Sequence, residues 1–314
     1  MKLSILIVTF NCADVLPACL DSLKQRPPSV EHEIIVSDNG STDGTLEVLL
    51  DRQPSVRQLE TGGNLGYAAG VRTAAAEATG ELLLVLNPDT EVLEGSIDTM
   101  IRALERDPSI WVVGACLVAP DGGPNTSWGD FPSAGWAFTE MAPWRRLGLP
   151  LRSRRQVGRT CDGVTTQRDV DWVSGAALMT RRTAWDAVGG FDPDYFLTFE
   201  ETDYCYRVRR SGGRVVLEPD ARIVHHEGAT IGRASVRAQV WFSDGLFTFL
   251  RKHHGRGVEL AARAWLLLVN SLLWCASWPL GVLSKETRGQ RPRYGALVRT
   301  AVTGKARLVD GSGR

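Results

Sequence analysis

The stretch "HEIIVSDNGSTDGTLEVLLDRQ" (residues 32–53) contains an apolar run, a polar turn and an amphipathic segment in direct succession. The apolar run "HEIIVSD" is typical of a strand buried on both faces. Cap residues at 41–45 then begin a predicted helix with Leu46, Leu49 and Leu50 on one side. A turn with two aspartates, Asp38 and Asp43, therefore stands at the end of a buried strand.

The same unit of strand followed by helix recurs along the first 120 residues. The predicted strands cover 3–10, 32–38, 56–60, 81–90 and 110–120, and the predicted helices cover 11–25, 41–53, 64–80 and 96–108. Strand and helix alternate four times, which indicates an α/β fold with a mostly parallel sheet flanked by helices.

Composition limits the class of protein. The chain has 314 residues, of which 43% are hydrophobic and 23% charged, and this suits one large α/β domain with appendages. A formal net charge of zero removes the general argument for a nucleic-acid partner. The six cysteines contain no C-x-x-C pair and no signal peptide is visible, so we expect reduced thiols in a cytoplasmic protein.

Three predicted strands end in polar residues: "TFN" at 9–11, "SDNGSTDGT" at 37–45 and "NPDT" at 87–90. In open α/β sheets, ligands bind at the carboxyl ends of strands. The first turn, "TFNCADVL", has neither the glycine pattern of dinucleotide folds nor a P-loop lysine. A nucleotide would therefore be held by side chains, although the turn at 38–45 is also explained by a turn and helix cap alone.

Seven motifs follow one another along the chain: "ILIVTFN" (5–11), "IIVSDNGSTDGT" (34–45), "GGNLGYAAGVRTA" (62–74), "LLLVLNPDT" (82–90), "DWVSGAALMTRR" (171–182), "VGGFDPDYFLTFEETDYCYRVRRSGG" (188–213) and "ARIVHHEGAT" (221–230). In this order they resemble the motifs of the family 2 inverting glycosyltransferases, which have the GT-A fold. Within that family the set is similar to bacterial rhamnosyltransferases. The resemblance implies transfer of a sugar from a nucleoside diphosphate donor, with L-rhamnose from dTDP-rhamnose as the first choice and a UDP-sugar as the alternative.

The resemblance also implies a donor site and a metal site. "NPDT" stands where the family often carries D-x-D, so that Asn87 replaces the first carboxylate and Asp89 keeps the second. Asp89 and His225 are the expected ligands of Mg²⁺ or Mn²⁺, with His226 turned elsewhere. A polar turn and a rim histidine are the alternatives. The implied donor-binding residues are Thr9, Asn11, Asp38, Gly63, Asn64, Asn87 and Asp89; Asp43 is expected to cap the following helix.

The catalytic base is expected in "FLTFEETDYCYRVRR", where Glu200, Glu201 and Asp203 crowd together. Such crowding raises the pKa of at least one carboxyl group. The family's pattern places the base at Glu201 and leaves Glu200 as the second choice, on the acceptor side. Asp203 is predicted to begin a helix. A purely capping role for all three residues is the alternative.

The acceptor side is expected around "VDWVSGAALMTRR". Trp172 could stack on a sugar or serve the core, and Ser174 and Gly175 indicate close backbone approach. Residues 120–168 lack periodicity, which is often a sign of function. Five arginines there could meet an anionic diphosphate-lipid or a membrane, or form an ordinary solvated loop: Arg145, Arg146, Arg152, Arg154 and Arg155.

The C-terminal part contains an uncharged stretch, 264–284, which Pro279 interrupts and basic residues flank. This pattern favours a helix lying in an anionic leaflet over a membrane span, with packing on the catalytic domain or in a homodimer as the alternative. We expect a GT-A domain over 1–235, with a nucleotide-binding half (1–118) and an acceptor-binding half (119–235), and a helical extension over 236–314.

The sequence thus predicts a cytoplasmic enzyme at the inner face of the cell membrane. Its expected partners are a nucleotide-sugar and a glycan or polyprenyl-diphosphate-linked acceptor, with no nucleic acid. A nucleotidyltransferase is disfavoured because the first loop lacks glycine and lysine. A degenerate nucleotide-sugar-binding scaffold stays open because Asn87 removes one carboxylate.

Overall fold

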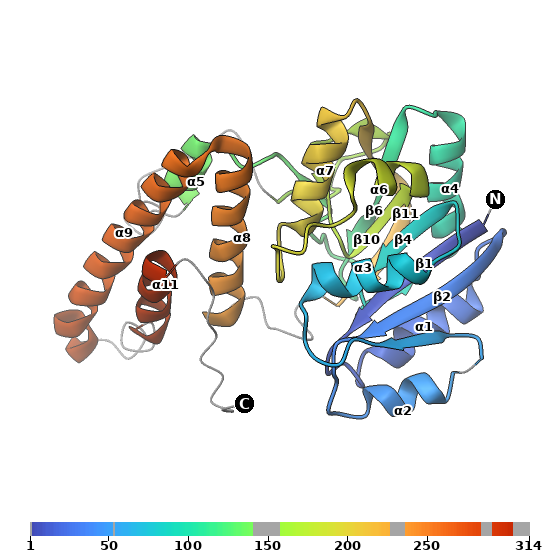
Figure 1. Cartoon of the computed structure of the whole chain (residues 1–314), viewed down its shortest axis with the longest axis horizontal. Coiled ribbons are helices and arrows are strands. Elements are labelled where there is room, and N and C mark those ends of the chain that lie inside the picture. The colour runs from blue at the N-terminus through green and yellow to red at the C-terminus, as the bar shows by residue number, and fades with distance from the viewer. Residues whose placement is uncertain (1, 53, 141–157, 227–235, 284–290, 304–314) are drawn as a thin grey trace. The chain divides into compact units, whose positions relative to one another are not determined.

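The computed structural model describes residues 2–52, 54–140, 158–226, 236–283 and 291–303 (Figure 1). The chain divides into two compact units, of which the first comprises residues 1–131 and 156–230 and the second residues 132–155 and 231–314. The predicted site residues all belong to the first unit. Gly228 and Thr230, which follow His225 in the motif "ARIVHHEGAT", and the five loop arginines between 145 and 155 lie outside the described residues.

The first unit is built on strands and six of the helices. The strands are β1 (Lys2–Thr9), β2 (Glu31–Asp38), β3 (Arg57–Glu60), β4 (Leu82–Leu86), β5 (Thr90–Val92), β6 (Ile110–Val118), β7 (Trp128–Gly129), β8 (Arg168–Asp169), β9 (Trp172–Val173), β10 (Ala177–Arg181) and β11 (Arg214–His225). The helices are α1 (Leu16–Gln25), α2 (Thr45–Leu50), α3 (Tyr67–Glu77), α4 (Ser96–Arg106), α6 (Arg182–Val188) and α7 (Glu200–Arg210).

The main sheet has the strand order β3-β2-β1-β4-β10-β6-β11-β5, and β8 pairs with β11. Strands β3, β2, β1 and β4 are parallel neighbours, as the alternation of strand and helix predicts. From β1 the chain passes through α1 to β2 and through α2 to β3, and both strands lie on one side of β1. Helix α3 then leads back to β4, which lies on the other side of β1. This reversal of strand order brings the carboxyl ends of β1 and β4 together as a ligand-binding edge.

Strand β10 is the main feature that the sequence did not predict. It lies between β4 and β6 and is antiparallel to both, with Leu178 opposite Val85 and Gly114. The segment before it, which includes Ser174 and Gly175, therefore begins at the carboxyl edge of β4. The sheet is thus mixed and mostly parallel, which confirms the predicted fold class.

Helices cover both faces of this sheet (Figure 1). Alternate residues of β1, such as Ile5 and Ile7, share a buried core with α1 and α4. On the other face, Gly70 of α3 lies so close to Val8 that a Cβ atom there would be 2.7 Å from a valine methyl group. Because β1 is buried on both faces, its carboxyl end is held firmly.

Two consecutive arginines anchor β10 to the helices around it. Arg182 donates hydrogen bonds to the carbonyl groups of Ala75 and Ala78 at the end of α3. Arg181 donates to the carbonyl groups of Leu104 and Ile110, at and just beyond the end of α4. Both guanidinium groups bind carbonyl oxygens at the C-terminal end of a helix, where positive charge is favourable.

The second unit contains α5 (Ala134–Glu140), α8 (Val236–His254), α9 (Arg256–Leu283) and α11 (Arg291–Thr303). Helix α9 packs against α5, α8 and α11. Arg263 of α9 pairs with Glu259 at 2.8 Å and lies over the ring of Phe247 at 4.3 Å. The unit is therefore a small helical assembly, and the domain boundaries expected from the sequence stay predictions.

Candidate active site

Asp38, at the end of β2, organises the turn that follows it. Its buried carboxylate accepts hydrogen bonds from the Thr9 hydroxyl (2.7 Å) and the Ser41 hydroxyl (2.6 Å). The backbone N–H groups of Gly40 (3.0 Å) and Ser41 (2.8 Å) donate to its other oxygen. Asp38 thereby ties β1 to the β2–α2 turn, and direct contact of Asp38 with a ligand stays a prediction.

Asn11 and Asp43 connect the same two loops. Asn11 has a positive φ of 50°, and its side-chain oxygen accepts a hydrogen bond from the Thr42 N–H at 2.7 Å. Asp43 accepts from the N–H of Thr45, the first residue of α2, at 3.0 Å and from that of Ala13 at 3.1 Å. The N-cap residue of α2 is Gly44 rather than Asp43, and Asp43 instead binds the N–H of the first helical residue and links the two loops, so the polar turn is a rigid structure rather than a loose loop.

The loop before α3 packs on this turn. A Cβ atom on Gly40 would lie 3.0 Å from the Cα atom of Gly63. The side chain of Asn39 donates to the carbonyl of Gly66 at 3.0 Å, and that of Asn64 accepts from the N–H of Gly66, also at 3.0 Å. Gly63 and Asn64 are therefore placed beside the strand ends that carry Thr9 and Asp38.

Gly66 connects these loops at the ends of β1 and β2 to the segment before α7. Its φ is +89°, and a Cβ atom there would lie 2.5 Å from the carbonyl oxygen of Phe196. The next N–H, that of Tyr67, donates to the same oxygen at 2.7 Å. The segment that leads to Glu200 is thus held against the start of α3.

We expect Gly66→Ala to destabilise the fold by about 3 kcal/mol, because a backbone with φ +89° and ψ 168° is essentially restricted to glycine and costs about 1–3 kcal/mol for alanine, and the contact with Phe196 adds to that cost. The measurement is urea unfolding. Gly62→Ala is the matched control, because Gly62 has φ +76° but no atom within 4 Å of an added Cβ. Equal losses in the two variants would show that the contact with Phe196 is unimportant.

Asp89 and His225 meet at the ends of β4 and β11. The Oδ1 atom of Asp89 lies 3.3 Å from Nε2 of His225, and the Asn87 amide lies 3.5 Å from the same nitrogen. The backbone N–H of His226 donates to the Asp89 carbonyl, while its ring contacts Glu91 at 2.6 Å. His225 rather than His226 thus faces the Asp89 carboxylate, in the arrangement expected from the sequence.

This pair suits a divalent cation. A carboxylate oxygen and an imidazole nitrogen are ligands that Mn²⁺ accepts, and a mixed set of this kind favours Mn²⁺ over Mg²⁺. The Nδ1 atom of His225 is buried and has no hydrogen-bond partner among the described residues. Within those residues, no group of three His, Cys, Asp or Glu side chains is close enough to hold a metal. The described residues therefore offer two candidate ligands to such a cation, Asp89 and His225.

Two residues in the left-handed region precede the acidic pair. Thr198 and Phe199 both have φ 71°, which is rare for a β-branched or bulky residue and is often found at functional sites. Helix α7 begins directly afterwards at Glu200, three residues earlier than predicted, so that Asp203 lies within its first turn rather than at its start. Asp203 is buried and paired with Arg207, which gives it a structural role.

The environments of Glu200 and Glu201 differ. Glu200 is 4% exposed, and its Oε2 atom has no hydrogen-bond partner among the described residues. Burial, reinforced by the charge of Glu201, raises the pKa of Glu200 well above its usual range. Glu201 is partly exposed, yet desolvation raises its pKa to about 7. The two carboxyl groups thus titrate as a pair, in which deeper burial favours the proton on Glu200 over Glu201.

Tyr67 marks the point where the acidic groups converge. Burial raises its pKa well above 10, and the charges of Glu200, Glu201 and Asp89 raise it further. Its hydroxyl donates to the carbonyl of Gly175 at 3.2 Å. Sequence analysis missed Tyr67, whose one signal was an aromatic residue with a polar tip at the start of a helix. Asp89 and Glu201 therefore share one region, although they are 112 positions apart in the chain.

The predicted acceptor residues Trp172, Ser174 and Gly175 have different surroundings. Trp172 is 6% exposed, and its indole N–H donates to the Asp130 carbonyl at 3.2 Å, which favours the structural alternative. The N–H of Ser174 donates to the Ser127 carbonyl at 2.8 Å. Gly175 approaches Glu201 closely, because a Cβ atom there would lie 3.4 Å from the Cβ atom of Glu201. Contacts of these residues with an acceptor stay predictions.

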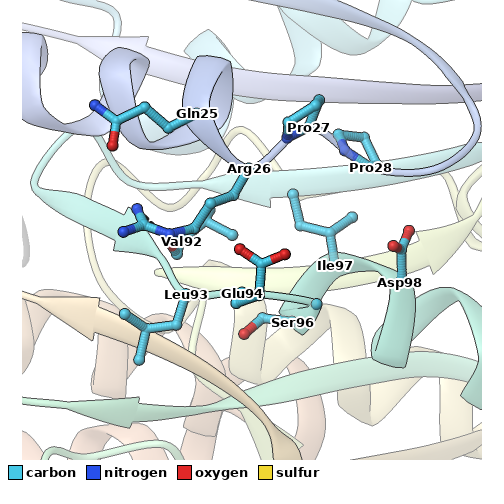
Figure 2. Close-up of a pocket in the computed structure, with 11 residues that line it drawn as sticks. Gln25, Arg26, Pro27, Pro28, Val92, Leu93, Glu94, Ser96, Ile97 and Asp98 are labelled. Carbon is cyan, nitrogen blue, oxygen red and sulfur yellow. Dashed lines mark hydrogen bonds between the residues drawn. The ribbon is translucent and has the colours of Figure 1, made fainter.

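A pocket also lies at the end of α1 and the start of α4 (Figure 2). Arg26 lines it and donates to the Val92 carbonyl at 3.3 Å, while Asp98 accepts hydrogen bonds from Ser29. None of its lining residues is a predicted site residue. Two of its charged groups, Arg26 and Asp98, are engaged by the protein, and we assign it no function.

Comparison with known proteins gives one family. The profile described as "Glycosyl transferase family 2" matches residues 4–173. The chain is 32% identical over 299 residues to the N-acetylglucosaminyl-diphospho-decaprenol L-rhamnosyltransferase of Mycobacterium tuberculosis, which covers 86% of this chain and 94% of that enzyme. It is 28% identical over 248 residues to the O-antigen biosynthesis protein RfbC of Myxococcus xanthus, which covers 77% of this chain and 19% of that protein.

Two solved structures share the fold. The mannosyltransferase PcManGT from Pyrobaculum calidifontis, in complex with GDP-Man and Mn²⁺, has a TM-score of 0.59 over 96% of this chain and 86% of that one. GalNAc-T7 with UDP, GalNAc and Mn²⁺ also has a TM-score of 0.59, over 80% and 48% respectively. Both are 17% identical to this chain, so they support the architecture and nothing finer.

Proposed function

Because the chain belongs to glycosyltransferase family 2, we propose that it transfers L-rhamnose from dTDP-rhamnose, with inversion, to a polyprenyl-diphosphate-linked glycan in cell-wall or surface polysaccharide synthesis. The mycobacterial relative named for such a rhamnosyltransferase supports the donor sugar and the acceptor. The observation that carries the proposal is that the turn at Gly175 and Ala176 contacts Glu201 and Tyr67 and also bonds to Asn87, two residues before Asp89.

In the proposed reaction Glu201 is the general base. A carboxylate oxygen of Glu201 takes the proton of the acceptor hydroxyl, and the acceptor oxygen bonds to the anomeric carbon of the donor. The bond from that carbon to the diphosphate oxygen breaks, and its electron pair leaves with the nucleoside diphosphate. A single displacement inverts the anomeric centre and needs no protein nucleophile. A raised pKa suits this role, because a base is most effective when its pKa is near the working pH.

Asp89 and His225 are the proposed ligands of a divalent metal. A metal bound there would neutralise the negative charge of the leaving nucleoside diphosphate. Asn87 lies beside the imidazole of His225 and adds no charge to the set. Holding the metal thus depends on Asp89, His225 and the diphosphate of the donor together.

The donor's nucleoside is proposed to lie against the linked loops of Thr9, Asn11, Asp38, Gly63 and Asn64. These loops are fixed by hydrogen bonds before any ligand binds, which reduces the entropy lost on binding. Phe10, between Thr9 and Asn11, is an exposed aromatic residue that could stack on the base. A UDP-sugar is the alternative donor.

The test of this function is a thermal-shift screen of nucleotide-sugars with and without Mn²⁺, followed by a transfer assay with a polyprenyl-diphosphate-linked glycan. We expect dTDP-rhamnose with Mn²⁺ to raise the melting temperature most and to be consumed. Binding without turnover of any donor would favour the degenerate scaffold. A preference for a UDP-sugar would show that the donor is a UDP-sugar rather than dTDP-rhamnose.

We also propose that the second unit associates with the inner membrane surface as a peripheral element. Among the described residues, one helix segment, Arg256–Cys275, is long and apolar enough to cross a membrane. Its exposed side carries Leu260, Leu268 and Leu272, which recur with helical spacing. Exposed basic residues, Arg251, Lys252 and Arg256, lie at one end of this face. An apolar face next to positive charge suits an anionic leaflet.

We expect Leu268→Glu combined with Leu272→Glu to lower recovery of the protein with anionic vesicles by roughly tenfold or more, because two leucines would no longer enter the interface. The two leucines are 51% and 62% exposed, so the variant should fold normally. Leu50→Glu is the matched control, because Leu50 is 60% exposed on α2. Equal co-sedimentation of all three proteins would exclude this face, and wild-type protein that resists alkaline carbonate extraction would indicate a span.

A further inference from the structure

We propose that Tyr67 is a positioning residue of the transfer reaction. Its hydroxyl group holds the carbonyl of Gly175 and thereby keeps the turn at 174–176 against the side chain of Glu201. The proposal rests on the proposed function, in which Glu201 is the base. It concerns a residue of the motif "GGNLGYAAGVRTA" to which the sequence analysis gave no role.

Tyr67 connects three parts of the chain. It is the first residue of α3, and its backbone N–H donates to the carbonyl of Phe196 in the segment before α7. Its side chain reaches the other way and donates to Gly175 in the turn before β10. One residue on the donor side thus fixes both segments that approach the acidic pair.

The turn that Tyr67 holds lies between the base and the metal ligand. On one side, a Cβ atom at Gly175 would be 3.4 Å from Cβ and 3.6 Å from Cγ of Glu201. On the other side, the Asn87 N–H donates to the Ala176 carbonyl at 3.0 Å. A shift of this turn would therefore move the stem of Glu201 relative to the segment that carries Asp89.

The surroundings of Tyr67 keep it a hydrogen-bond donor. Three carboxyl groups, those of Glu200, Glu201 and Asp89, lie within electrostatic reach of its hydroxyl, and all of them disfavour a phenolate. The O–H group thus stays protonated throughout the range in which Glu201 gains or loses its proton. The contact with Gly175 is the same in both states of the base, as a positioning role requires.

The test compares Tyr67→Phe with Tyr204→Phe in the full-length protein. Both variants keep a ring and lose one hydroxyl, and Tyr204 is a buried residue whose hydroxyl bonds to Thr180 at 2.7 Å. We expect Tyr67→Phe to lower kcat roughly tenfold with the KM values for donor and acceptor within twofold of wild type, because a small displacement of the base slows the chemical step. Tyr204→Phe should keep kcat.

A second measurement does not depend on activity. We expect amide hydrogen exchange in a peptide covering 172–178 to be faster in Tyr67→Phe than in the wild type and unchanged in Tyr204→Phe. Unchanged exchange in Tyr67→Phe overturns the proposal even if the protein transfers no sugar. Raised KM with normal kcat also overturns it, because the hydroxyl would then contact a substrate. A wild-type protein that turns over no donor would instead refute the proposed function.

Discussion

Glu201→Gln is expected to lower the transfer rate by about 10²–10⁴-fold, which is the usual contribution of a general base, while donor binding is retained. Glutamine has nearly the shape of glutamate but cannot take the proton of the acceptor hydroxyl. Initial rates and the dissociation constant of the nucleotide-sugar, measured on the same preparation, separate these two effects. A variant that transfers sugar at the wild-type rate would refute the assignment of the base.

The same substitution should stabilise the fold at pH 8. The pKa of Glu201 is raised in the folded protein from its ordinary value of 4.5 to about 7, so the folded state binds more protons than the unfolded state between these values. Stability is therefore lost as pH rises through this window, and the wild type carries the full cost above about pH 7. A glutamine avoids that cost, and the melting temperature of the variant should exceed that of the wild type at pH 8 but not at pH 4.5.

Lost activity together with raised stability distinguishes a missing base from a damaged fold. The wild-type rate should rise with pH through about 7 and level off above it, because Glu201 must be ionised to act. Glu200→Gln is the matched control, because burial raises the pKa of Glu200 and thereby favours its neutral form, which glutamine resembles, so its replacement should cost less than tenfold in rate. If the Glu200 variant loses as much activity as the Glu201 variant, the two carboxyl groups act together as one unit.

The donor side of the site could be predicted from sequence because its parts follow one rule. Parallel strands that alternate with helices end at the same edge of a sheet, so the polar residues after β1, β2 and β4 had to meet. Thr9, Asp38 and Asp89 each follow a continuous apolar run. In this part of the chain, the local order of apolar strands and helices is therefore sufficient to predict which polar residues come together in the fold.

The opposite side could not be derived in this way. Strand β10 is five residues long and enters the sheet between β4 and β6, and nothing in "ALMTR" indicates those neighbours. The early start of α7 depends on Thr198 and Phe199, which adopt a backbone that their residue types disfavour. Tyr67 acquires its role only because the turn before β10 comes to lie beside α3. These features arise from tertiary contacts, which residue patterns do not record.

Asp89→Asn is expected to lower transfer by about 10²–10³-fold, because it removes the carboxylate that lies beside His225 and would hold the metal. A chelator should have a similar effect on the wild type, and added Mn²⁺ should reverse it. The Asp89→Asn variant should not recover under the same Mn²⁺ concentrations. Activity that persists both in the chelator and in this variant would contradict the assignment of Asp89 as a metal ligand.

The weakness of this site also predicts how metal and donor bind. Asn87 contributes no charge, and the described residues contain no third acidic, histidine or cysteine ligand, so the free protein should bind Mn²⁺ weakly. Titration followed by electron paramagnetic resonance should show tight binding only when dTDP is present, because its diphosphate completes the coordination sphere. Asn87→Asp restores a second carboxylate and should tighten Mn²⁺ binding without nucleotide by roughly tenfold. If dTDP leaves the affinity of the wild type unchanged, the diphosphate is not a ligand, and the charge of the leaving group must be offset elsewhere.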